Sequence, residues 1–234
     1  MCVCGSASAR AEVFFILKQN DPNFWRLLQI ADSAFPTGGF AHSGGIEAAV
    51  QHGELRTIPE LVQFLEDSLW QLAHGSLPFA NEAHAHREKF SECDELAEVF
   101  LTNHVARRAS AVQGRTFLGT CEKAFAFEWE KSPDLYYHLA PVFGAVLHDL
   151  SIERTDMQRA FLHISLRGLL SSAVRLGLVG PYHGQEIQRK LSTTMEMVIH
   201  ACQDLGLNDV AQTAPLIDLF QNNQDRLYSR LFQS

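Results

Sequence analysis

Cysteine is scarce in this chain of 234 residues, and its pattern argues against one class of protein. The five cysteines are Cys2, Cys4, Cys93, Cys121 and Cys202, an odd number at irregular spacing. Disulfide-dependent secreted domains carry regularly paired cysteines, so this pattern indicates a reducing compartment, and we expect the cytoplasm. Cys2 and Cys4 could form a metal or modification site, but a short stretch of small residues is also typical of a plain terminus.

Long apolar runs are also missing from the sequence. Residues 13–17 are apolar for only five positions, and no basic region precedes them. A signal-peptide core or a membrane-spanning helix needs a longer run, so we expect no membrane partner.

Positive charge is in deficit. The chain has 19 Lys and Arg residues against 27 Asp and Glu residues, and its net charge is −8. The longest basic run is the Arg107-Arg108 pair. Phosphate contacts need clustered Lys and Arg side chains, so we expect no nucleic-acid partner.

Helix-forming residues are abundant, whereas β-branched aliphatic residues are few. Leu and Ala together number 54, against 22 for Val and Ile. This ratio predicts an all-α fold. The length fits a single compact helical domain of about eight to ten helices, given the usual length of a helix. We place this domain at residues 21–206, between flexible tails at residues 1–20 and 207–234.

Capping signals predict where several helices begin. Asp21 followed by Pro22 predicts one helix start, and the pair Thr57 and Glu60 has the spacing of a capping box. Ser43 is expected to cap a short helix over residues 44–52. Helical periodicity also predicts a break between residues 93–109 and 110–128, a helix over 138–150 and a last long helix over 184–205. Beyond Gly206 the periodicity fades.

A glycine-rich loop at residues 35–45 resembles a phosphate-binding loop in composition alone. A P-loop needs a Lys after its glycines, but no Lys or Arg lies between Arg26 and Arg56. The glycines instead favour close packing of the backbone against a neighbouring helix or a partner, with Phe35 and Phe40 as apolar anchors. His42, inside this loop, is either a simple loop histidine or a functional residue.

The best metal-like cluster is formed by Glu82, His84, His86 and Glu88. On a helix, no single face collects three of these side chains, so a solvated helix face is favoured over a helical metalloenzyme. No nucleophile motif is present either. Composition and spacing alone therefore predict a non-catalytic helical protein.

Four segments resemble one known family in the correct order. Residues 27–47 resemble the N-terminal signature of the urease accessory protein UreF family, and residues 138–144 resemble its middle segment. Residues 166–181 resemble its late helix, and residues 227–232 resemble its C-terminal tail. The stretch before Phe24 is not covered.

The resemblance implies an all-helical homodimer that binds two partners, the accessory protein UreD (also called UreH) and the nickel-carrying GTPase UreG. The complex would engage apo-urease and support GTP-dependent nickel insertion, with this chain as a non-catalytic adaptor. Nickel would be cargo and GTP would bind the partner, so we expect no cofactor, no catalytic residue and no metal site here. In the family, the extreme C-terminus orders on binding UreD.

The resemblance also implies the partner-binding residues. Arg230 would recruit the GTPase, and Tyr228, Leu231 and Phe232 would dock as apolar groups. Phe40 and His42 would lie near the same surface. An alternative is that the chain activates the GTPase directly, with Arg230 or Arg108 as an arginine finger.

Overall fold

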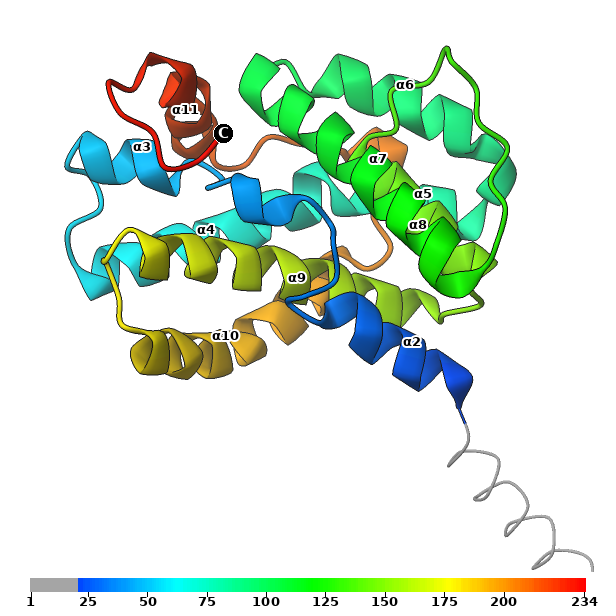
Figure 1. Ribbon diagram of the computed structural model, residues 1–234, viewed down its shortest axis with the longest axis horizontal. Helices are drawn as coiled ribbons and strands as arrows, with labels where there is room; N and C mark the ends of the chain where they lie inside the picture. The colour runs from blue at the N-terminus through cyan, green and yellow to red at the C-terminus, as the bar shows by residue number, and fades with distance from the viewer. Residues whose placement is uncertain (1–20) are drawn as a thin grey trace, which may run out of the picture.

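The computed structural model describes residues 21–234, and within that range it contains helices and no strand. These helices form one compact body (Figure 1), which confirms the all-α prediction. The α-helices are α2 (Pro22–Ala31), α3 (Ile46–Gln51), α4 (Ile58–Gly75), α5 (Leu77–Ala85), α6 (Phe90–Phe100), α7 (His104–Phe125), α8 (Leu139–Asp149), α9 (Arg154–Arg175), α10 (Pro181–Cys202) and α11 (Pro215–Asn223). Four 3₁₀ turns complete them, η1 (Gly39–Ala41), η2 (Arg87–Lys89), η3 (Leu207–Asp209) and η4 (Gln224–Arg226). The predictions for residues 1–20, including Cys2 and Cys4, lie outside the described residues.

Helix α8 is the centre of the fold and packs between α5 and α7. Its residues 140–147 are all buried, because the segment is apolar on every side. Gly144 faces the backbone of α5, where an added Cβ would overlap the carbonyl oxygen of Ala80. The small residue therefore lets the two helices approach closely, and it fixes the position of α8.

A buried carboxylate sets the start of α8. Asp94, on α6, is fully buried and accepts hydrogen bonds from the backbone N–H groups of Tyr136, Tyr137 and His138 at 2.6–2.9 Å. Tyr137 has a φ of 61°, a conformation that a tyrosine adopts only when its surroundings hold it there. Asp94 thus fixes the sharp turn that aims α8 into the core.

Helices α4, α9 and α10 pack together beside this centre, and α2 lies along α9 (Figure 1). The predicted capping box of α4 is present: Thr57 Oγ1 accepts from Glu60 N, and Glu60 accepts from Thr57 N. Asp21 also caps α2 as predicted. No helix within residues 21–234 combines the length and the apolar character that a membrane span requires.

Two local predictions are wrong. Ser43 does not cap a helix, because α3 begins at Ile46 after Gly45, whose φ of 94° turns the chain into the helix. The break expected at residues 109–110 lies instead at residues 101–103, where Asn103 accepts from Val105 N and Ala106 N. At Asn103 a cap that satisfies free helix N–H groups decides the boundary, whereas at Gly45 the positive φ of the glycine decides it.

Candidate partner-binding site

The glycine loop and the C-terminal residues meet on one surface of the molecule. In Figure 1 the chain end lies beside α3 and α11, close to the loop that follows α2. The N–H of Gln233 donates to Ala41 O at 2.8 Å, and the N–H of Ser43 donates to Ser234 O at 2.5 Å. We call this region the C-terminal junction, meaning residues 35–45, Glu47, Arg175 and residues 224–234.

The loop glycines allow this meeting. Gly44 and Gly45 have φ values of 63° and 94°, which side chains other than glycine rarely adopt. A Cβ at Gly44 would lie 2.5 Å from Leu169 Cδ2, and one at Gly45 would lie 3.2 Å from Gln221 N. The loop thus packs its backbone against α9 and α11, which confirms the prediction of close packing.

Glu47, on α3, binds the backbone of the C-terminal residues. Its side chain is buried and accepts hydrogen bonds from the N–H groups of Leu231 and Phe232 at 2.6 and 3.2 Å. It also accepts from Gln224 Nε2 at 2.5 Å. A buried carboxylate is costly without donors, so this side chain strongly favours the docked position of residues 231–232.

Arg175 joins the two sides of the C-terminal junction. Its guanidinium lies between two aromatic rings, 3.8 Å from the centroid of Phe40 and 4.1 Å from that of Phe232. It also donates from Nη1 to Phe40 O at 2.6 Å. The stacked cation therefore couples the glycine loop to the C-terminal residues.

A cluster of charges lies at the edge of the C-terminal junction. Asp225 accepts from Arg108 Nη2 at 3.0 and 3.1 Å and from Arg230 Nη1 at 3.0 Å, and His104 Nε2 lies 3.3 Å away. Burial raises the pKa of the Asp225 carboxyl, but Arg108, then His104 and Arg230, outweigh that effect and hold the pKa below its ordinary value. The carboxylate is therefore charged at neutral pH.

The structure brings all six sequence-predicted residues to the C-terminal junction. Tyr228 is fully exposed, Phe40 is 73% exposed, and Leu231 and Arg230 are also exposed. Phe232, by contrast, is buried beneath Arg175. Three exposed apolar side chains beside exposed arginines form a surface suited to a protein partner.

His42 is half-buried at the C-terminal junction, next to the last residue of the chain. Its Nδ1 is hydrogen-bonded to Ser234 Oγ, and its Nε2 has no hydrogen-bond partner among the described residues. Burial lowers the pKa of His42, and the positive charge of Arg108 lowers it further. The imidazole is therefore neutral at pH 7.

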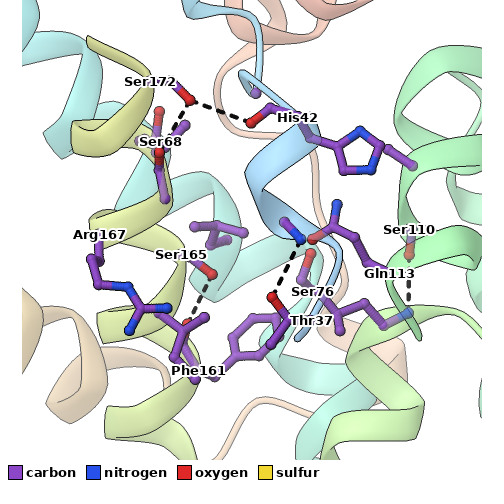
Figure 2. Close-up of a pocket in the computed structure, with 18 of the residues that line it drawn as sticks. Thr37, His42, Ser68, Ser76, Ser110, Gln113, Phe161, Ser165, Arg167 and Ser172 are labelled. Carbon is purple, nitrogen blue, oxygen red and sulfur yellow. Dashed lines mark hydrogen bonds between the residues drawn. The ribbon is translucent and has the colours of Figure 1, made fainter. Parts of the chain in front are cut away.

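A cavity of about 1040 Å³ lies beneath the glycine loop (Figure 2). It is lined by apolar rings and by polar side chains from several helices, among them Ser68, Ser110, Gln113, Ser165 and Ser172. Ser172 Oγ donates to His42 O at 3.3 Å, so the cavity wall also supports the loop.

Sequence reasoning missed Glu47, Arg175 and Asp225. Glu47 and Arg175 lie inside the segments that resemble the family, but a single charged residue in a helix is usually solvent-exposed, so neither was distinctive. Asp225 was not distinctive, because two of its three partners, Arg108 and His104, are more than one hundred residues away in the chain.

The candidate metal cluster is not assembled. Helix α5 ends at Ala85, so His86 and Glu88 leave the helix, and these two pair with one another at 3.6 Å. His84 Nε2 is bonded to the Ile152 carbonyl, and Glu82 pairs with Lys89. Across residues 21–234, no three His, Cys, Asp or Glu side chains are grouped to hold a metal ion.

These features define an all-α protein that carries a composite surface made from a glycine loop and its C-terminal residues. The UreF family model matches residues 55–192. The chain is 32% identical over 225 residues to "Urease accessory protein F" of Oryza sativa subsp. indica, covering 91% of this chain and 86% of that protein. It is 33% identical over 221 residues to the protein of the same name from Arabidopsis thaliana, covering 90% and 92%. The chain belongs to the UreF family.

Proposed function

We propose that this chain is a urease accessory protein that acts as a non-catalytic adaptor in the cytoplasm. With UreD (UreH) and the GTPase UreG, it would support GTP-dependent insertion of nickel into apo-urease. The names of its relatives support the connection to urease. In this proposal nickel is cargo and GTP is bound by the partner, so the chain needs no cofactor of its own.

One observation carries the adaptor role. The glycine loop and the C-terminal residues, which lie far apart in sequence, form one surface with Phe40, Tyr228, Leu231 and Arg230 exposed on it. Exposed aromatic side chains and arginine are enriched at the energetic centres of protein interfaces. The C-terminal junction is therefore the surface that we assign to the partner proteins.

Co-purification tests this role. UreG should be retained by the tagged chain together with UreD, and Arg230→Ala should reduce that retention while the helical circular-dichroism signal stays unchanged. Arg115→Ala is the matched control, because Arg115 is also exposed and lies outside the C-terminal junction. Normal retention of UreG by Arg230→Ala would contradict the assignment.

A second candidate function is direct activation of the GTPase by an arginine finger. The side chains of Arg108 and Arg230 are both exposed, and both pair with Asp225. Two arginines close together on the surface favour this alternative. An arginine finger contributes about 10³–10⁵ in turnover. GTP turnover by UreG should collapse with Arg108→Ala or Arg230→Ala while binding persists, if this alternative holds.

The proposed homodimer has a candidate surface at α2 and α10. Phe24, Trp25, Leu28 and Met197 are each about half exposed or more. Of these four, Leu28 lines a groove formed by α2, α9 and α10. Light scattering should give the mass of a dimer for the wild type and of a monomer for Trp25→Arg.

A further inference from the structure

The charge cluster at Asp225 is unbalanced. Arg108, Arg230 and His104 all face this one carboxylate, and the two arginines are permanently charged. Two other surface arginines show a different balance: Arg154 pairs with Asp204 at 2.7 Å, and Arg159 pairs with both Asp156 and Glu196. In a chain with a net charge of −8, this excess of positive charge is local and distinctive.

The backbone segments that carry these cations are held in place independently of Asp225. Arg108 and His104 are one turn apart on α7, a helix of 22 residues. Arg230 is next to Leu231, whose N–H is bonded to the buried Glu47. The backbone positions that carry the two arginines therefore stay close to each other when the carboxylate between them is replaced.

Asp225 itself can be displaced at small cost. The side chains of Arg108 and Arg230 are 51% and 43% exposed, and that of Asp225 is 29% exposed. Exposed ion pairs change an equilibrium constant by no more than about fivefold, because water solvates the separated charges well. An incoming anion can therefore take the place of Asp225 without disturbing the core.

We propose that Arg108 and Arg230 together bind a carboxylate on the surface of the GTPase partner, and that Asp225 is the internal competitor that this carboxylate displaces. The proposal rests on the recruitment role proposed above. It adds Arg108 to the recognition site and assigns an acidic patch to the partner.

A protein carboxylate fits the site better than a nucleotide phosphate. The group already bound between the arginines is a carboxylate, with Arg108 Nη2 shared between its two oxygens. The exposed Tyr228 lies three residues from Asp225 and offers apolar contact area, which a protein surface would use. The cluster thus has the composition of a protein interface.

Asp225→Asn tests the competition directly. The affinity for purified UreG, measured by titration calorimetry in the presence of UreD, should rise about two- to fivefold, the range of one exposed ion pair. Asp204→Asn changes the net charge by the same amount at another arginine pair and should leave the affinity unchanged. Equal or weaker binding by Asp225→Asn, or an equal gain with Asp204→Asn, would overturn the proposal.

A charge reversal gives the second test. Arg108→Glu should weaken binding of UreG by more than tenfold, and raising the salt concentration should weaken the wild-type complex. Unchanged affinity of Arg108→Glu would refute the proposal, as would a loss of GTP turnover without loss of affinity, which would indicate a phosphate ligand. Failure of the wild-type chain to bind UreG at all would instead contradict the proposed function.

Discussion

Helix α8 and the C-terminal junction are both packed against α9, but different forces hold them. Helix α8 is apolar on every side and is fixed by close approach to α5 at Gly144. The C-terminal junction is fixed by a buried carboxylate, a stacked cation and backbone hydrogen bonds. Close packing of apolar side chains therefore fixes the core, whereas directional polar contacts hold the C-terminal junction in place.

Gly144→Ala should disrupt the packing of α8 against α5 and should have the largest effect on stability. The new Cβ would overlap the Ala80 carbonyl, so α5 and α8 would have to separate. We expect a loss of about 3 kcal/mol in the free energy of unfolding, the upper end for an overpacked core. Urea denaturation measures this change.

Gly119→Ala on α7 is the control, because a Cβ there meets nothing within 4 Å. It should be neutral or stabilising by up to about 1 kcal/mol, since alanine favours the helix. A similar change for both variants would mean that close packing against Ala80 does not decide the effect at Gly144.

Glu47→Gln should destabilise the C-terminal junction and leave the core around α8 unchanged. The amide has the same shape but removes the charge that the N–H groups of Leu231 and Phe232 bind. We expect amide exchange at these two residues to become about ten- to one-hundredfold faster, equivalent to about 1.5–3 kcal/mol for charged hydrogen bonds. Exchange within α8 should not change, and Glu54→Gln, at an exposed neighbouring position, should have no effect.

Arg175→Ala should have a smaller effect on the same surface. It removes the cation between the rings of Phe40 and Phe232, an interaction of about 0.5–2 kcal/mol. Limited proteolysis should then cleave the C-terminal residues faster than in the wild type. Arg175→Lys retains the charge but not the planar stacking, so its cleavage rate should lie between the two.

The two regions also differ in how far the sequence predicts them. The apolar run of α8 and the capping signals at Asp21 and Thr57 are local, so the helices they define could be predicted. Helix α11 was not expected, because the helical periodicity fades beyond Gly206 and α11 depends on contacts with α3 and α7. The role of Glu47 likewise depends on partners about 180 residues away, which spacing cannot reveal.

Acidification should have the smallest effect, a loss of stability at the C-terminal junction and not in the core. The pKa of His42 is lowered by burial and by Arg108, so the folded C-terminal junction binds its proton less well than the unfolded chain does. The stabilisation is therefore complete above the ordinary pKa of 6.5 and decreases as the pH falls below it. Asp225 has its pKa lowered from 3.8, so its contribution is lost only in a more acidic range. Between pH 7.5 and about 5.5, amide exchange at residues 231–233 should accelerate in the wild type, after correction for the intrinsic pH dependence of exchange. His42→Gln should abolish this acceleration, and its persistence in that variant would place the titrating group elsewhere.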